Sequence, residues 1–468
     1  METVGILIVS YGAREVAIVD TLTRSQNYKV ELYIADKQLN PFNIQHATKH
    51  VIIPDLNIQN ICKFAQDHKD KIDFAIVGSE KPIIDGLRDL IENKTGIPVI
   101  CPKKEYAIEE SKVRQRLLFQ EIAPEANPRF KIFEPKDYQN KTIVKKDVYK
   151  WLDELDNQAV VKPDKPTAGK GVGVWGDHFT NREELFEHFM SNFQYSAVII
   201  EEKVEGEESS CMAFCDGKHF IPLPDTRDYK RAFDGDKGPN TGGMGSYKDV
   251  DDKLPFLTTT ERENEIKLAN KVFNGWSKQI NDPTALRGVP LYLAFMHTGK
   301  DIKILEINSR PGDPESINLF PTIKDDFVDV CYKMITGNLL NVELNKVATV
   351  VTYKVPPDYG GYMNLYPNQT IKSAINTPID FTEAYKLTKK YGDKIRIYPG
   401  AMELRDGKNY ALKSRAIGVL AIGDSIEDAR KISQEGARAI SGGELWNRTD
   451  IAAQHHIDKS IRHMEKLR

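Results

Sequence analysis

DYKRAFDGDKGPNTGGMG, residues 228–245, is the stretch around which the rest of this 468-residue chain is organised. It combines five glycines with charged side chains of both signs, and its apolar residues follow neither a helix nor a strand period. Glycine lets backbone N–H groups approach a ligand closely, and mixed charges can grip a small polar molecule. The stretch therefore predicts a loop, either a solvated one or one that binds a substrate. Its structured flanks favour binding.

The overall composition narrows the class of protein. A chain of this length is too long for one hydrophobic core and predicts two to four domains. The net charge of -3 gives no sign of the excess positive charge that proteins use to bind nucleic acid or an anionic membrane surface. No apolar run has the length of a membrane-spanning helix, and the acidic start METVGILIVSYG is unlike a signal peptide. The five cysteines lack CxxC spacing and are expected to be reduced thiols, which favours a cytoplasmic location.

The first hundred residues alternate between strand and helix patterns. Apolar runs at 4–10, 30–35, 73–77 and 97–100 are separated by helical segments, one of which is expected from Pro82 to about Glu92. This alternation predicts a parallel, Rossmann-like sheet. Asp36 lies where a dinucleotide-binding acid would stand, but the first turn has Gly12 alone and lacks G-x-G-x-x-G. We therefore do not expect nicotinamide binding.

A glycine-lysine loop joins two predicted strands, 158–162 and 172–175. Its sequence, PDKPTAGKGVG at 163–173, lacks Walker A spacing and returns to a strand. It is either a plain hairpin turn or a flap that folds over a triphosphate, with Lys170 facing the charge. Lys162, at the end of the first strand, favours the flap because it can point at the same phosphates.

A run of charged residues, 201–208, follows the apolar strand 197–200 and contains Gly206, where the backbone could turn. Such runs are usually solvated faces. Between two strands that look buried, this one could instead form the hinge that contacts an adenine ring. Further along, a capping box at Thr260 and Glu263 predicts the start of a long amphipathic helix.

The strand at 303–308 offers two oxygen ligands. Glu306 and Asn308 are two residues apart and share one face, whereas Leu305 and Ile307 are expected on the other, buried face. A carboxylate and an amide oxygen suit Mg²⁺, which binds one or two protein groups together with nucleotide phosphates. The alternative is an ordinary exposed strand face. Arg310 follows the strand and could stabilise the charge on a transferring phosphoryl group.

Four segments, 160–174, 199–208, 228–245 and 305–315, occur in an order and spacing that resemble the ATP-grasp ligases of the glycinamide ribonucleotide synthetase (phosphoribosylamine–glycine ligase) family. Residues 231–245 are the most specific part, and the resemblance extends over about 1–440. It implies an α/β protein with three domains. These are an N-terminal Rossmann-like domain (1–104), a two-part ATP-grasp core (105–340, with a mobile subdomain at about 130–205) and a small C-terminal α/β domain (346–440). A helical tail, 441–468, has no counterpart in the resemblance.

The resemblance also implies an activity and a site. The family joins glycine to 5-phosphoribosylamine in purine biosynthesis, converts ATP to ADP and phosphate, and uses Mg²⁺ or Mn²⁺. The matching metal ligands are Glu306 and Asn308. The matching ATP contacts are Lys112, Lys162, Gly169, Lys170 and Gly171 at the phosphates, Glu201, Glu202 and Val204 at the adenine, and Glu208 at the ribose. The matching substrate contacts are Asp228, Lys230, Gly243, Arg310 and Asp313, of which Asp228, Lys230 and Arg310 are the catalytic candidates.

The chain departs from the family pattern at Val16, Pro311 and Ser316. Two of these departures lie where the phosphoribosyl group should sit, so its contacts stay unassigned. We expect His455, His456 and His463 in the tail to be solvated. Two alternatives remain open, an ATP-grasp ligase for a different amine and a nucleotide-binding protein without ligase activity. We expect a monomer or a small homo-oligomer.

Overall fold

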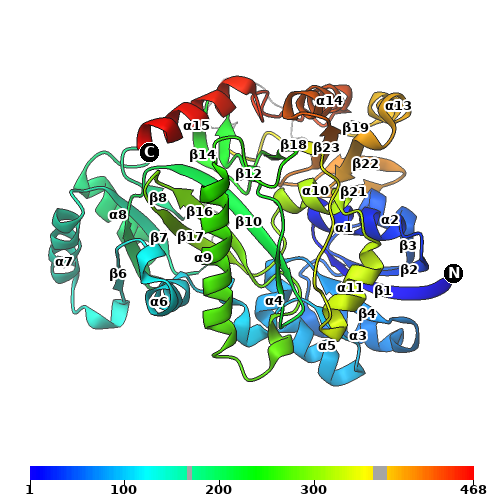
Figure 1. Cartoon of the computed structure of the whole chain (residues 1–468), viewed down its shortest axis with the longest axis horizontal. Coiled ribbons are helices and arrows are strands. Elements are labelled where there is room, and N and C mark those ends of the chain that lie inside the picture. Colours follow the sequence, from blue (N-terminus) through cyan, green and yellow to red (C-terminus); the bar gives the residue numbers. More distant parts are fainter. Residues whose placement is uncertain (166–170, 362–376) are drawn as a thin grey trace.

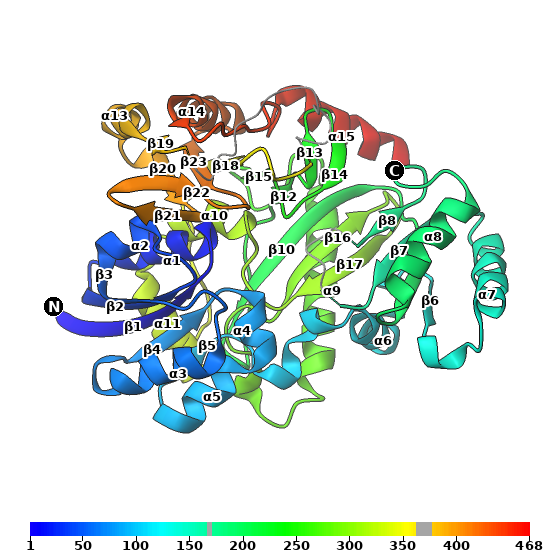
Figure 2. The same cartoon turned by 180° about the vertical axis from the view of Figure 1, so that it is seen from behind.

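The computed structural model describes residues 1–165, 171–361 and 377–468. Figure 1 shows the N-terminal sheet on one side of a central antiparallel sheet and a smaller α/β unit on the other, with the C-terminal elements beside the N-terminal sheet. Figure 2 gives the same arrangement from behind. In the described ranges, no helix combines the length and the apolar character that crossing a membrane requires. All five cysteines are buried with free thiols, as expected.

The N-terminal sheet is parallel, as the alternating pattern predicts, with strand order β3-β2-β1-β4-β5. Its strands are β1 (Glu2–Ser10), β2 (Tyr28–Asp36), β3 (Ala47–Ile52), β4 (Phe74–Val77) and β5 (Val99–Ile100). Its helices are α1 (Ala13–Thr23), α2 (Pro41–His46), α3 (Ile58–Asp67), α4 (Glu80–Asp85) and α5 (Leu87–Thr95). The single helix expected from Pro82 is divided into α4 and α5, because Gly86 adopts a φ of 90° between them.

Both faces of this sheet are buried, which explains why its strands read as continuous apolar runs. Ile6 and Ile8 of β1 pack with α1 and with α11 (Phe327–Thr336), a helix from much later in the chain. Leu7 and Val9, on the other face, pack with α3 and α5. The N-terminal sheet therefore depends on a later segment to cover one face.

Two antiparallel four-stranded sheets follow. The smaller unit has the order β6-β9-β7-β8, and the central sheet has the order β11-β10-β16-β17. The smaller unit comprises β6 (Phe130–Phe133), α7 (Lys141–Glu154), β7 (Ala159–Pro163), β8 (Gly173–Val174), α8 (Arg182–Phe193) and β9 (Val198–Glu202). The central sheet and its helices are α6 (Lys112–Ile122), β10 (Glu207–Cys215), β11 (Phe220–Pro222), α9 (Thr259–Ser277), β16 (Tyr292–His297) and β17 (Ile302–Asn308). Each sheet packs its helices over a separate apolar core.

The stretch 228–245 is not an irregular loop, and that part of the prediction is wrong. Residues 231–240, here called the central hairpin, form β13 (Arg231–Phe233) and β14 (Lys237–Asn240). Gly235 and Asp236 turn the chain with φ values of 74° and 56°. One of the glycines that break a strand period, Gly235, thus supplies the turn together with Asp236, as in other short hairpins.

The C-terminal sheet incorporates the flanks of the central hairpin. Its order is β12-β15-β18-β23-β20. Strand β12 (Arg227–Asp228) pairs with β15 (Gly245–Lys248), and β15 pairs in turn with β18, about a hundred residues away. The remaining elements are α10 (Glu315–Leu319), β18 (Ala348–Lys354), β19 (Ile379–Asp380), α13 (Thr382–Tyr391), β20 (Ile395–Pro399), β21 (Met402–Arg405), β22 (Lys408–Ala411), β23 (Ile417–Gly423), α14 (Ile426–Ala439), β24 (Ser441–Gly442) and α15 (Gln454–Leu467).

The C-terminal helix α15 is packed, not a free tail. Ile457 and Met464 are buried in the core that α1, β15 and β18 share. His455 is exposed as expected. The expectation is wrong for the other two histidines: His456 lies 3.0 Å from Asp450, and His463 lies 2.7 Å from Glu207.

Helix α9 begins two residues earlier than predicted, because its capping box is formed by Thr258 and Glu261. This start places Arg262 in a buried polar cluster. Its Nη1 atom lies 2.6 Å from Asp225, 3.0 Å from Glu265 and 3.5 Å from the Cys211 sulfur. These three side chains are grouped closely enough to hold a metal ion, but the guanidinium already occupies the position among them.

We predict that Arg262→Met lowers the free energy of unfolding by about 3–5 kcal/mol, because it removes the guanidinium that compensates the buried Asp225 and Glu265 carboxyl groups and leaves Glu265 beside the His297 ring. Urea denaturation would measure the change. Lys267→Met, at an exposed position of the same helix, is the matched control and should change stability by less than about 0.5 kcal/mol. Equal stability of the two variants would contradict the role given to Arg262.

Candidate functional site

A cleft of about 560 Å³ lies between the smaller sheet and the central sheet. Residues from the smaller unit, the central sheet, the 228–242 segment and α15 all line it. Of the residues predicted for the site, those in the cleft wall are Lys112, Lys162, Glu201, Glu202, Val204, Glu208, Asp228, Lys230, Glu306, Asn308, Arg310 and Asp313. Gly169 and Lys170 lie outside the described residues. The structure therefore brings most of the predicted positions to one place.

Strand β17 presents the two residues predicted as metal ligands to the cleft. Glu306 and Asn308 stand opposite Ala294 and Tyr292 of β16. The expectation that Leu305 is buried on the opposite face is wrong, since Leu305 also lines the cleft. The register between β16 and β17 shifts at this point, and such an irregularity re-aims the side chains on one strand.

The Glu306 carboxylate is ionised despite its burial. Burial alone would raise its pKa, but the charges of Lys230, Lys112, Lys162 and Arg310 lower the pKa to about 2. An ionised carboxylate beside an amide oxygen is a donor set that fits Mg²⁺ or Mn²⁺. The surrounding cations would meet the phosphates that complete the coordination of such an ion.

Lys162 is held by a buried ion pair. Its Nζ atom lies 2.7 Å from Glu201 and 3.3 Å from the Leu305 carbonyl oxygen. Glu201 is also bound by Arg116 at 2.5 Å. Burial lowers the pKa of Lys162, and the Glu201 charge acts in the opposite direction. The Glu201 side chain thus positions a lysine in the cleft wall.

Glu202, the next residue, points away from Glu201 as strand alternation requires. It pairs with Arg129 at 2.8 Å. Both carboxylates of the predicted hinge are therefore engaged in ion pairs within the protein. Val204 follows in the cleft wall.

The 228–230 segment brings an ion pair and a carboxyl group into the cleft. Lys230 pairs with Glu208 of β10. Asp228 Oδ1 is buried and has no hydrogen-bond partner among the residues that the structure describes. Burial raises the pKa of Asp228 well above its usual value, and the nearby Glu315 charge adds to the effect. Asp228 is thus a buried acid that holds a proton more readily than an ordinary aspartate.

Glu315 was missed by sequence reasoning. It begins α10, is buried in the cleft wall and accepts a 2.5 Å hydrogen bond from the Tyr292 hydroxyl. Burial raises its pKa. The signal available in the sequence was its place at the end of the Arg310–Asp313 segment.

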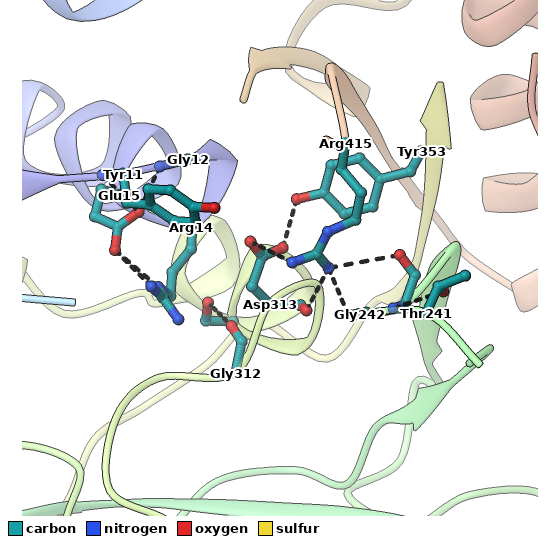
Figure 3. Close-up of polar contacts among 12 residues, drawn as sticks. Tyr11, Gly12, Arg14, Glu15, Thr241, Gly242, Gly312, Asp313, Tyr353 and Arg415 are labelled. Carbon is teal, nitrogen blue, oxygen red and sulfur yellow. Dashed lines mark hydrogen bonds and ion pairs between the residues drawn. The ribbon is translucent and has the colours of Figure 1, made fainter. Parts of the chain in front are cut away.

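Arg415 was also missed, and it ties the predicted substrate residues together (Figure 3). Its guanidinium lies 3.1 Å from the Asp313 carboxylate and donates to the Gly242 and Asp313 carbonyl oxygens at 2.6 Å each. The Tyr353 hydroxyl donates to the other oxygen of Asp313 at 2.5 Å. No sequence pattern pointed to Arg415, because it lies about a hundred residues away, in the C-terminal domain.

The backbone conformation and close neighbours of position 243 require a glycine there. Its φ is +111°, and a Cβ atom there would lie 2.7 Å from Asp228 Oδ1 and 2.7 Å from Pro314. Any side chain would therefore disturb the buried carboxyl group.

The N-terminal loop reaches the same end of the cleft. The Gly12 N–H donates to Glu15 at 3.0 Å, and Arg14 donates to the Pro311 carbonyl oxygen at 3.0 Å. Figure 3 shows this loop facing Asp313 and Arg415. Three domains thus meet around Asp313.

Comparison with known proteins agrees with the geometry. The family profiles described as "Phosphoribosylglycinamide synthetase, N domain" and "Phosphoribosylglycinamide synthetase, ATP-grasp (A) domain" match residues 4–110 and 129–316. A phosphoribosylamine–glycine ligase from Methanocella arvoryzae is 36% identical over 466 residues, 99% of each chain. The Methanobrevibacter smithii ligase is 34% identical over 468 residues, again 99% of each chain. These matches extend past 441, so most of the tail does have a counterpart.

Comparison with solved structures leads to the same family. The crystal structure of a phosphoribosylamine–glycine ligase from Thermotoga maritima has a TM-score of 0.72 and 25% identity, and the match covers 96% of this chain and 100% of that one. N5-carboxyaminoimidazole synthetase from Staphylococcus aureus shares the fold, with a TM-score of 0.58 at 12% identity over 93% of this chain and 98% of that one. The chain belongs to the phosphoribosylglycinamide synthetase (phosphoribosylamine–glycine ligase) family of ATP-grasp enzymes.

Proposed function

We propose that the cleft between the two antiparallel sheets is where this ATP-dependent ligase of purine biosynthesis joins glycine to 5-phosphoribosylamine, giving glycinamide ribonucleotide, ADP and phosphate. One observation carries the proposal. The ionised Glu306 carboxylate, beside Asn308, faces a set of cations contributed by separate elements, with Lys112 at the start of α6, Lys162 on β7 and Arg310 after β17. This is an arrangement for a metal-bound triphosphate.

The reaction we propose has two steps. A glycine carboxylate oxygen attacks the γ-phosphorus of ATP; the new P–O bond forms as the bond to the bridging oxygen breaks, and ADP leaves. The amine nitrogen of phosphoribosylamine then attacks the carbonyl carbon of glycyl phosphate, and phosphate leaves as the C–O bond breaks. Neither step needs a protein nucleophile, so catalysis rests on positioning, charge stabilisation and exclusion of water.

The side chains divide these tasks. A bound Mg²⁺ or Mn²⁺ on Glu306 and Asn308 would neutralise phosphate charge, and a second ion would depend largely on phosphate oxygens. Lys162 and Arg310 face the transferring phosphoryl group. Asp228 and Glu315 are neighbouring carboxyl groups whose pKa values are raised. When one of them is ionised, it can take the proton that the neutral amine nitrogen loses as it attacks.

We infer that the protein acts as a monomer or a small homo-oligomer. The buried free thiols of all five cysteines support a reducing, cytoplasmic location. Size-exclusion chromatography with light scattering would measure the oligomeric state.

Product analysis tests the assignment. Purified protein is incubated with ATP, Mg²⁺, glycine and freshly made phosphoribosylamine, and we expect ADP and glycinamide ribonucleotide in equal amounts. Chelation of the metal should stop both. Formation of ADP without glycinamide ribonucleotide, or a preference for a different amine, would overturn the substrate assignment.

We predict that Glu306→Gln lowers kcat by about 100-fold or more, because the metal's share of phosphate charge stabilisation amounts to several kcal/mol. Steady-state kinetics over a range of Mg²⁺ concentrations would show it. Asp301→Asn, in the exposed turn before β17, removes a carboxylate from the same sheet and should retain activity. Normal turnover by Glu306→Gln would exclude Glu306 as the ligand.

We predict that Gly243→Ala abolishes most of the ligase activity, because its methyl group would collide with Asp228 and Pro314. Gly407→Ala is the matched control, since Gly407 also has a positive φ of 74° but no atom lies within 4 Å of the added Cβ. Both variants bear roughly 1 kcal/mol of backbone strain. Only Gly243→Ala should change kcat and the KM for glycine, and equal activity in the two would contradict the steric argument.

A further inference from the structure

The central hairpin, residues 231–240, is held from outside by the C-terminal segment. Figures 1 and 2 show the end of the chain crossing beside β13 and β14 before α15 continues toward the smaller unit. The Trp446 ring stacks on Phe233 with a centroid distance of 5.4 Å. The Ala452 N–H donates to the Tyr229 hydroxyl at 3.0 Å. These contacts fasten one end of the segment beside the turn of the hairpin and the other end to Tyr229, just before its first strand.

The turn of the hairpin is bound residue by residue. Thr449 donates to Asp234 through its N–H at 2.9 Å and through its hydroxyl at 2.5 Å. The Gly235 N–H donates to Asp450 at 2.7 Å. Such a turn, rich in glycine and charge, has little apolar area with which to offset the entropy of being ordered. The C-terminal segment supplies the missing contacts.

Arg448 is the centre of this network. It is fully buried and donates to the Arg231 carbonyl oxygen at 2.9 Å and to Asp236 at 3.0 Å. It also pairs with Asp450 at 2.7 Å. A buried guanidinium needs several acceptors in fixed positions, and two of its acceptors belong to the hairpin. The arginine therefore fixes the hairpin relative to the C-terminal domain.

The helix that follows forms part of the cleft itself. His456, Lys459 and Ser460 of α15 line the cleft wall. His463 lies 2.7 Å from Glu207, the residue before the predicted ribose contact Glu208, and Arg227 binds the other oxygen of Glu207 at 2.7 Å. One continuous segment thus touches the hairpin, the start of β10 and the cleft.

We propose that residues 446–463 act as a clasp that positions the central hairpin over the reacting groups and keeps water from the acyl phosphate. Arg448, Thr449 and Asp450 are positioning residues that act through the hairpin on Lys230 and Asp228. This inference rests on the proposed function, since it assumes that the hairpin covers the substrates. It gives the C-terminal segment a role in coupling ATP use to ligation.

The test uses two variants of the full-length chain, Asp450→Asn and Thr449→Val. The first removes the charge that binds Gly235 and Arg448; the second removes one exposed hydroxyl contact and so preserves folding. Glu465→Gln, an exposed carboxylate on α15, is the matched control. Three quantities are measured for each: hydrogen exchange of the amides at 231–240, the ratio of ADP to glycinamide ribonucleotide, and the KM for glycine.

We expect faster exchange in the hairpin, more ADP than glycinamide ribonucleotide, and a KM for glycine raised about 10-fold, since small misplacements of positioning groups can cost up to about 100-fold in rate. The control should match the wild type. Folded Asp450→Asn and Thr449→Val variants with unchanged exchange and equimolar products would overturn the clasp. A purely structural role would lower stability without changing the product ratio. If the wild type itself makes no glycinamide ribonucleotide, the proposed function fails, while hydrogen exchange still decides whether the segment holds the hairpin.

Discussion

The structure depends on keeping many ionised groups out of bulk water in one cleft. Burying a charge costs several kcal/mol unless a partner and further hydrogen bonds compensate it. Here three of the cations near Glu306 each have their own carboxylate, with Lys162 on Glu201, Lys230 on Glu208 and Arg310 on Glu109. These pairs hold long side chains in position before any ligand arrives. A metal-bound triphosphate would add charges to a cleft whose groups are already arranged for them, which is preorganisation in the electrostatic sense.

The end of the cleft around Asp313 has a different construction, because it lies where three domains meet. Asp313 follows the central sheet, Arg415 comes from the C-terminal domain, and the loop at Gly12 comes from the N-terminal domain. The strands that flank the central hairpin are part of the C-terminal sheet. The glycine-rich segment is therefore anchored at its base by main-chain pairing and at its turn by side chains from the end of the chain. Its conformational freedom is removed by tertiary contacts, although its composition is that of a flexible loop.

Several features could be predicted from the sequence because their causes are local. The apolar runs of β1, β2 and β4 reflect burial on both faces of a parallel sheet, so the N-terminal fold class follows from alternation alone. Glu306 and Asn308 were predictable as a pair because strand alternation places residues two apart on one face. The same rule failed at Leu305, where an irregular register changes which way one side chain points. The start of α9 was misplaced because three threonines and two glutamates offer two equivalent capping boxes.

By itself, the sequence determined the alternation of strands and helices in the N-terminal part, the family, and many of the polar groups that face the cleft. Tertiary structure alone decided which charges are neighbours. Arg415 and Arg448 carry no local signal, yet each binds a segment more than 150 residues away. The physical reason is range: periodicity and turn chemistry act over a few residues, whereas an ion pair or a hydrogen bond in a buried cleft depends on the packing of whole domains.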